Sequence, residues 1–195
     1  MIDRWMRLMR KKRIFLLLFL GFLFLLFFQS QWLARWMYPI HFEESIQKVA
    51  ATYNLDPLLI AAVIRVETNY ELGRESRKGA IGIMQLMPNT ATWAMEQLKV
   101  DKQWSLDQLK NEAEPSIRLG AWYLKSLHKQ FKGNRIAAIA AYNAGPGNVS
   151  KWLSNGTWDG QYDTAQDQIP FGETRQYVKR VIHYYEKYKS IYSLM

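Results

Sequence analysis

Glu67 is the residue of this chain best suited to acid–base chemistry. It ends an apolar run at residues 57–67, which reads PLLIAAVIRVE. At helical spacing Ile60, Ile64 and Glu67 share one face, so the carboxyl group lies on the buried stripe of a helix. Burial and the negative end of the helix dipole both disfavour the charged form and raise the pKa of a carboxyl group. Glu67 is therefore a candidate general acid that keeps its proton near neutral pH.

Three further segments, rich in glycine, amide and aromatic residues, follow Glu67 in the chain. They are GAIGIMQLMP at residues 79–88 with Ser76 just before it, AAYNAGPG at residues 140–147, and IPFGETRQYV at residues 169–178. In this order and spacing, and together with Glu67, they resemble the lytic transglycosylase catalytic domain of glycoside hydrolase family 23, the soluble lytic transglycosylase type. The resemblance runs from about residue 42 to residue 188.

The resemblance implies an all-α, lysozyme-like helical domain at residues 42–190, with helices around a glycan-binding cleft. It also implies cleavage of the β-1,4 bond between N-acetylmuramic acid and N-acetylglucosamine in peptidoglycan. Glu67 would first protonate the glycosidic oxygen and then act as base while a 1,6-anhydro ring closes, with no metal or organic cofactor. A hydrolytic muramidase like goose-type lysozyme and a non-catalytic wall-binding module remain the alternatives.

Six further positions match substrate-binding residues of that family. The resemblance implies such roles for Ser76, Gln85, Met87, Tyr142, Asn143 and Glu173. Simpler explanations stand beside three of them. Ser76 is also an ordinary turn residue, Met87 an ordinary core residue, and Tyr142 a buried aromatic residue that needs a hydrogen-bond partner.

Other residues of these motifs are expected to act through the backbone or through packing. Arg175 and Tyr177 are interpreted as structural, and Thr68 stands where the family usually has serine directly after the catalytic acid. The remaining group consists of glycines expected to permit special backbone conformations, namely Gly79, Gly82 and Gly145.

The motifs contain one obvious acid, whereas glycoside cleavage ordinarily uses two carboxylates. Glu71 and Glu75 lie in a polar loop beside basic residues, where surface ion pairs are expected, and Glu173 opens a helix, where a carboxylate suits the dipole. A single acid suggests that the substrate supplies the missing nucleophile.

The N-terminus carries basic residues followed by an apolar run. Residues 1–13 contribute +5 of the chain's net charge of +9, and residues 14–28 are uncharged. With Trp32 and Trp36 as interfacial aromatic residues, we expect a single-pass transmembrane signal anchor at residues 14–36, a cytoplasmic basic segment and an extracytoplasmic catalytic domain. A cleaved signal peptide is the alternative. Localised wall cutting at the cell membrane would suit a cell-envelope protein complex as partner.

Composition excludes several classes of site. The 195-residue chain has no cysteine, so disulfides, thiolate metal sites and a cysteine nucleophile are absent. The three histidines lack metal-ligand spacing. The basic N-terminal block is explained by membrane topology and not by nucleic-acid binding, while the remaining charge of +4 favours contact with an anionic cell wall.

Helix-capping residues divide the domain into expected elements. Asp56 and Pro57 open the helix that ends near Glu67. The other expected elements are a helix capped by Asn89 and ending at Leu98, one from Glu114 to Gly133, one capped by Asn134 and reaching Asn143, a long loop at 154–168, and a final helix from Glu173 to Tyr188.

Overall fold

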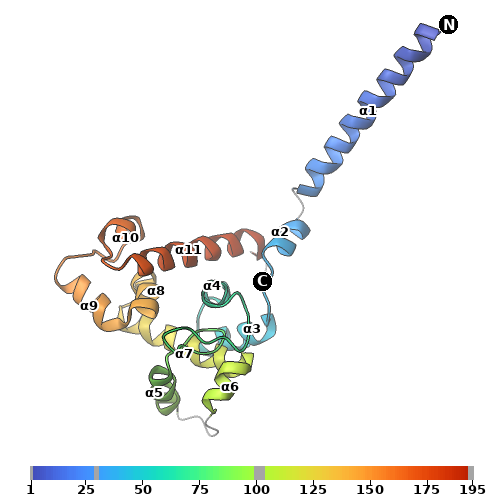
Figure 1. The fold of residues 1–195 in the computed structure, drawn as a ribbon. Helices are drawn as coiled ribbons and strands as arrows, with labels where there is room; N and C mark the ends of the chain where they lie inside the picture. The colour runs from blue at the N-terminus through green and yellow to red at the C-terminus, as the bar shows by residue number, and fades with distance from the viewer. Residues whose placement is uncertain (1, 29–30, 99–103, 193–195) are drawn as a thin grey trace. The chain divides into compact units, whose positions relative to one another are not determined.

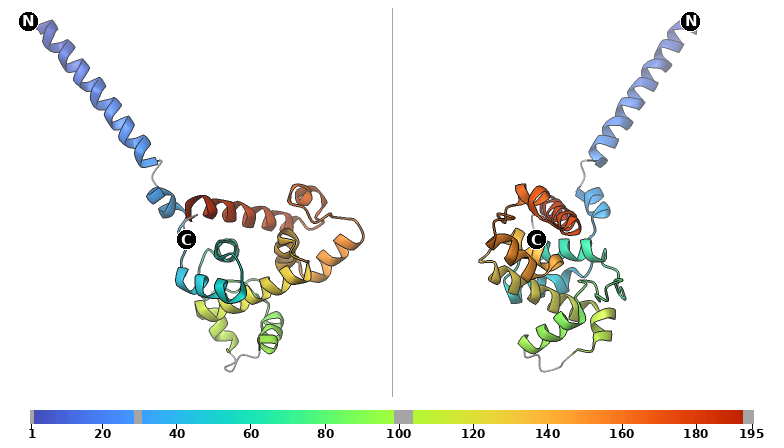
Figure 2. Two further views of the ribbon diagram at one scale, coloured as in Figure 1. Left: turned by 180° about the vertical axis from the view of Figure 1, so that it is seen from behind. Right: turned by 60° about the vertical axis from the view of Figure 1, so that its left-hand side comes forward.

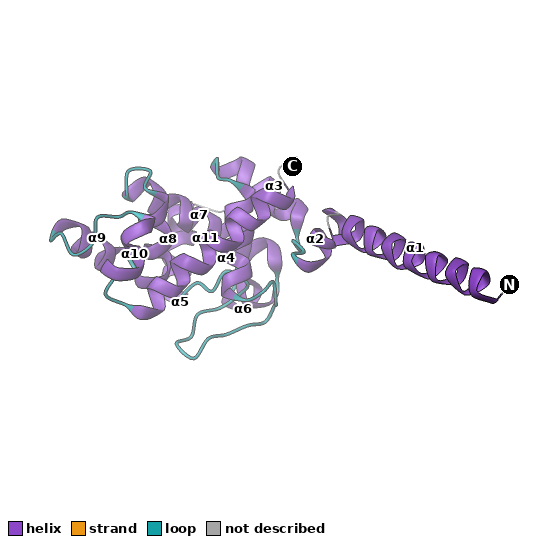
Figure 3. Ribbon diagram, turned by 90° about the horizontal axis from the view of Figure 1, so that it is seen from above, coloured by secondary structure: helices purple, strands orange, loops and turns teal. Residues whose placement is uncertain are grey.

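The computed structural model describes residues 2–28, 31–98 and 104–192. All regular elements in these ranges are helices, joined by loops that contain two isolated β-bridges (Figure 3). The chain divides into two compact units, Met1–Ile40 and His41–Met195. The expectation of an all-α domain is confirmed for the described residues.

The first unit consists of α1 (Ile2–Phe28) and α2 (Gln31–Met37). None of the described helices is both long enough and apolar enough to cross a membrane. The transmembrane helix predicted at residues 14–36 is therefore not confirmed. The uncharged run at residues 14–28 would measure only about 22 Å as a helix, against a hydrocarbon core of about 30 Å. Residues 29–30 of the predicted anchor lie outside the described residues.

The second unit contains nine described helices, drawn from cyan to red in Figures 1 and 2. They are α3 (Glu43–Tyr53), α4 (Pro57–Glu67), α5 (Pro88–Leu98), α6 (Leu106–Asn111), α7 (Ala113–Gln130), α8 (Arg135–Ala144), α9 (Pro146–Ser154), α10 (Tyr162–Gln168) and α11 (Gly172–Tyr192). Helix α4 packs against α3 and α11, and α8 packs against α7, α9 and α11. The core therefore surrounds α4, which carries Glu67.

Helix α4 is apolar almost throughout, and seven of its eleven residues are buried. Its first turn is fixed as predicted, because Asp56 accepts a hydrogen bond from the backbone N–H of Leu58 at 2.9 Å and Pro57 takes the first helical position. Tyr185 of α11 donates to the other oxygen of Asp56 at 2.6 Å. The capping carboxylate thus ties the beginning of α4 to α11.

Two element predictions are wrong in part. The helix expected to be capped by Asn89 already includes Pro88, which fits the first turn of a helix because it needs no N–H partner there. The loop expected at residues 154–168 ends in α10, whose Ala165 is buried. Tertiary burial thus stabilises a short helix that its polar composition disfavours.

Candidate active site

Glu67 is the last residue of α4, and its side chain is half-buried. Burial raises its pKa from 4.5 to about 7, because removal of water penalises the carboxylate. The hydrogen bond from Tyr177 and the charge of Arg180 oppose this increase, while the charge of Glu173 adds to it. Near neutral pH both the protonated and the charged form of Glu67 are therefore populated. A side chain that can donate a proton and later accept one needs both forms.

Tyr177 on α11 is the direct partner of Glu67. Its hydroxyl group donates to Oε1 of Glu67 at 2.7 Å, and the ring is buried. Tyr177, interpreted from the sequence as structural, is thus a direct hydrogen-bond partner of Glu67. A sequence signal existed, since Glu173 and Tyr177 are four residues apart and share one helical face.

Tyr142 on α8 links Glu67 to the loop that follows α4. Its hydroxyl group donates to the backbone oxygen of Met84 at 2.9 Å. Burial raises the pKa of Tyr142 well above its usual value, and the negative charge of Glu67 adds to the increase. Tyr142 therefore lies close enough to Glu67 for the charge of that carboxylate to affect its pKa, while its hydroxyl group donates its proton to the loop.

The loop between α4 and α5 is fixed by buried hydrogen bonds. The hydroxyl group of Thr68 donates to the backbone oxygen of Ile83 at 2.9 Å, and the backbone N–H of Met84 donates to Oγ of Ser116 at 3.4 Å. Thr68 thus uses the hydroxyl group that it shares with serine. Isolated β-bridges join Ile81 to Glu75 and to Leu86. These hydrogen bonds and bridges therefore hold the backbone of the loop in place.

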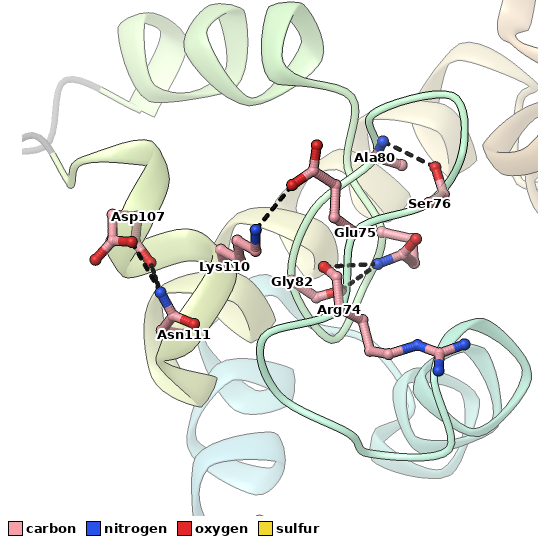
Figure 4. A network of polar contacts seen from close by, with 9 residues as sticks. Arg74, Glu75, Ser76, Ala80, Gly82, Asp107, Lys110 and Asn111 are labelled. Atoms are coloured by element: carbon pink, nitrogen blue, oxygen red, sulfur yellow. Dashed lines mark hydrogen bonds and ion pairs between the residues drawn. The ribbon is translucent and has the colours of Figure 1, made fainter.

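Two of the three loop positions predicted to bind substrate form hydrogen bonds within the loop itself, and Figure 4 shows this for Ser76. Oγ of Ser76 accepts from the backbone N–H of Ala80 at 2.9 Å. Nε2 of Gln85 donates to the backbone oxygen of Gly82 at 2.8 Å, and the side chain of Met87 is 44% exposed. These contacts give Ser76 and Gln85 a role in shaping the loop, and substrate contact by all three residues stays a prediction.

Of the other two predicted positions, Asn143 joins α8 to α11, and Glu173 joins α11 to the loop after α4. Thr174 donates to Oδ1 of Asn143 at 2.7 Å. Glu173 is exposed and pairs with Lys78 at 3.1 Å, and its charge reaches Glu67. The structure therefore brings Tyr142 and Glu173 into the surroundings of Glu67 and ties Asn143 to the start of α11. Among the described residues, no group of three or more His, Cys, Asp or Glu is placed to hold a metal ion.

Replacement of Tyr177 by phenylalanine is expected to raise the pKa of Glu67 above about 7. The tyrosine hydroxyl stabilises the carboxylate, so its loss favours the protonated acid. The alkaline limb of a pH–rate profile is expected to follow the loss of protonated Glu67, and it should move to higher pH by on the order of one unit. Tyr185→Phe removes a comparable α11 hydroxyl at the opposite end of α4 and should leave the limb in place. An unchanged or lower midpoint in Tyr177→Phe would contradict the assignment.

Comparisons with known proteins identify the family of this chain. A family model described as Transglycosylase SLT domain matches residues 44–164. The soluble lytic murein transglycosylase of Salmonella typhimurium is 36% identical over 154 residues, covering 78% of this chain and 23% of that protein. This chain spans about a quarter of the length of the soluble lytic murein transglycosylases it matches.

Two solved structures share the helical domain. The lytic transglycosylase Slt of Pseudomonas aeruginosa, crystallised as an inactive mutant, matches with a TM-score of 0.72 and 37% identity over 80% of this chain and 25% of its own. The 70 kDa soluble lytic transglycosylase of Escherichia coli matches with a TM-score of 0.76 and 33% identity over 82% of this chain and 26% of its own. The lysozyme-like fold expected from the sequence is thereby confirmed, and the chain belongs to the transglycosylase SLT domain family.

Proposed function

We propose that this chain is a peptidoglycan lytic transglycosylase in which Glu67 acts as general acid and then as general base. The observation that carries the proposal is the half-buried carboxyl group of Glu67, with a pKa of about 7 and a hydrogen bond from Tyr177. Membership of the transglycosylase SLT domain family supports the choice of substrate.

In the first step, the protonated carboxyl group of Glu67 donates its proton to the glycosidic oxygen between N-acetylmuramic acid and N-acetylglucosamine. The bond from C1 of the muramic acid to that oxygen breaks, and the acetamido group of the same sugar stabilises the positive centre at C1. The product bearing N-acetylglucosamine leaves as an alcohol. Glu67 is then a carboxylate, which the hydrogen bond from Tyr177 stabilises.

In the second step, this carboxylate removes the proton from the C6 hydroxyl group of the muramic acid. The C6 oxygen attacks C1 and forms the 1,6-anhydro ring. Glu67 ends the cycle protonated, as it began, and no water is consumed. A pKa of about 7 suits both steps, because neither the acid nor the carboxylate is strongly disfavoured near neutral pH.

The position of Glu173 favours this scheme over one with two catalytic carboxylates. Among the described residues, Glu173 is the carboxylate whose charge raises the pKa of Glu67. It is exposed and paired with Lys78 at 3.1 Å, so it is poorly suited to be a desolvated nucleophile. We propose that Glu173 contacts substrate at the rim of the site while the sugar itself supplies the attacking oxygen.

The remaining predicted residues are proposed to surround the same glycan. Tyr142 and Asn143 lie near the end of α8, and Met87 offers an exposed apolar surface just before α5. Ser76 and Gln85 fix the loop that carries Met87, and we propose that their outer polar atoms also contact sugar. These assignments rest on the family resemblance and on the position of the loop next to Glu67.

Mass spectrometry of the muropeptides released from purified peptidoglycan tests the proposed reaction. The chain is expected to release products that end in 1,6-anhydro-N-acetylmuramic acid, and Glu67→Gln is expected to release none. Products with a reducing end would make the protein a hydrolase. Binding without release by the unaltered chain would make it a wall-binding module.

Peptidoglycan lies outside the cytoplasmic membrane, so we propose that the catalytic unit acts there. The N-terminal unit supports export, because basic residues precede the uncharged run at residues 14–28, an arrangement typical of targeting segments. Cell fractionation with antibody detection would locate the chain. Recovery in the cytoplasm alone would contradict this proposal.

A further inference from the structure

The carboxyl end of α4 stops directly beyond Glu67. Asn69 and Tyr70 take positive φ angles of 56° and 66°, a conformation that does not continue a right-handed helix. The last carbonyl groups of a helix have no partner within the helix itself. One of them, the carbonyl oxygen of Val66, accepts a hydrogen bond from Nη2 of Arg180 at 3.4 Å. A side chain of α11 thus binds the last turn of α4.

Arg180 and Tyr177 contact this end of α4 from the same helix. They are three residues apart in α11, so they lie next to each other on its surface. Tyr177 donates to the carboxyl group of Glu67 at 2.7 Å, and Arg180 donates to the backbone of the preceding residue, Val66. Helix α11 therefore holds both the side chain of the candidate acid and the backbone that carries it.

Arg180 also acts on Glu67 through its charge. Among the described residues, Arg180 is the cation whose charge lowers the pKa of Glu67, against the increase caused by burial. The carbonyl end of a helix is its negative pole, so a guanidinium group bound there is favourable. Arg180 therefore stabilises the carboxylate of Glu67 at a position where burial and the helix dipole both disfavour it.

The other titratable groups of the elements around Glu67 are negative, neutral, exposed or paired elsewhere. Glu173 raises the pKa of Glu67, and it pairs with Lys78 at 3.1 Å. The guanidinium group of Arg65, on α4 itself, lies 5.5 Å from the centre of a tyrosine ring of α11. The remaining groups are the buried hydroxyls of Tyr142 and Tyr177 and the exposed charges of α3, which also packs against α4, namely Glu43, Glu44 and Lys48.

We propose that Arg180 is a positioning residue for Glu67, because it holds the last turn of α4 and places a positive charge near the carboxylate that forms in the first step. This inference rests on the proposed function, in which Glu67 gives its proton to the glycosidic oxygen. By stabilising the carboxylate that remains, Arg180 makes Glu67 a stronger acid. This role needs no contact between Arg180 and the sugar.

Variants of the full chain that remove or keep this charge test the role of Arg180. Arg180→Gln should raise the alkaline midpoint of the pH–rate profile by about half a unit, since solvent screens the charge of an exposed side chain. On the acid side of that midpoint kcat should fall by about fivefold, because a weaker acid transfers its proton less readily, while KM stays unchanged. Arg180→Lys should restore the midpoint and most of kcat. Lys179→Gln, which removes the neighbouring exposed charge, should have no effect.

Direct titration of Glu67 by NMR provides a second measurement. Glutamate is labelled at its carboxyl carbon, and the signal that is missing from Glu67→Gln identifies Glu67. Its midpoint should rise in Arg180→Gln and stay in place in Arg180→Lys and Lys179→Gln. An unchanged midpoint in Arg180→Gln would overturn the proposal, and a higher KM beside it would mean that Arg180 contacts substrate instead. If Arg180→Gln fails to fold, Arg180→Met, which keeps a long apolar stem, is judged by the same criteria.

The two measurements separate this inference from the proposed function. Anhydro products from the unaltered chain, together with the same NMR midpoint of Glu67 in Arg180→Gln, would leave the proposed reaction standing and remove the role of Arg180. No anhydro products from the unaltered chain, together with a raised midpoint in Arg180→Gln, would remove the proposed reaction and leave Arg180 as the residue that adjusts the charge of Glu67.

Discussion

Replacement of Glu67 by glutamine is expected to reduce muropeptide release by at least about a thousandfold, because both proton transfers pass through this one side chain. The amide has nearly the shape of the carboxyl group and can still accept the hydrogen bond that Tyr177 donates at 2.7 Å. The fold and binding of glycan should therefore be kept. Initial rates of release from purified peptidoglycan, normalised to folded protein, measure the effect.

The same substitution is expected to change the pH dependence of stability. The pKa of Glu67 is about 7 in the folded state, above its ordinary value of 4.5. The stability that the protonated carboxyl group of Glu67 contributes is fully present below about pH 4.5. It is lost as the pH rises through 7, because the folded state must then hold a poorly solvated charge. At pH 8, Glu67→Gln should be more stable than the unaltered chain by about 1 to 3 kcal/mol. Urea unfolding at pH 5 and at pH 8 measures this difference.

Glu71→Gln is the matched control for both effects. Glu71 lies four residues beyond Glu67, is exposed, and pairs with Arg74 at 3.2 Å. Exposed pairs contribute little to stability, so activity and unfolding should stay close to those of the unaltered chain at both pH values. Retained turnover in Glu67→Gln would remove this residue from the proposed role.

The position of Glu67 was predictable because its determinants are local. An Asp–Pro pair starts α4, an apolar stripe directs one face into the core, and the helix ends at the acid itself. Burial of Glu67 itself is the largest cause of its raised pKa. The motif glycines were predictable for a related reason, since Gly79, Gly82 and Gly145 all have positive φ angles.

The partner of Glu67 was missed because it depends on tertiary packing. Tyr177 lies 110 residues further along the chain and reaches Glu67 only because α11 packs along α4. A motif alone does not show which face of its helix meets another helix. The polar sequence of α10 likewise gave no sign that Ala165 and Ile169 would be buried.

The loop after Glu67 leaves no room for a side chain at Gly82. An added Cβ atom would come against the backbone oxygen of Leu109 and lie 2.6 Å from Oγ of Ser116. The φ angle of Gly82 is +74°, a conformation that residues with a Cβ atom rarely adopt. Lys110 of α6 also binds this loop, because it forms a 2.8 Å ion pair with Glu75 (Figure 4).

Gly156→Ala provides a control that separates backbone strain from crowding. Gly156 has a φ angle of +73°, and an added Cβ atom would meet nothing within 4 Å. Its replacement by alanine should cost only about 1 kcal/mol, the usual cost of the left-handed conformation. The difference in stability between Gly82→Ala and Gly156→Ala therefore measures the effect of the close approach of Leu109 and Ser116 to Gly82.

Gly82→Ala is expected to destabilise the domain by about 3 kcal/mol or more, since strain is added to a clash with backbone that cannot move without opening α6. Thermal and urea unfolding measure the loss. Below the unfolding transition, activity should also fall, because the same loop carries Gln85 and Met87 and is fixed to Tyr142 through Met84. A stability equal to that of Gly156→Ala would mean that α6 yields to the added atom, and that the tight contact at Gly82 does not determine the position of the loop beside Glu67.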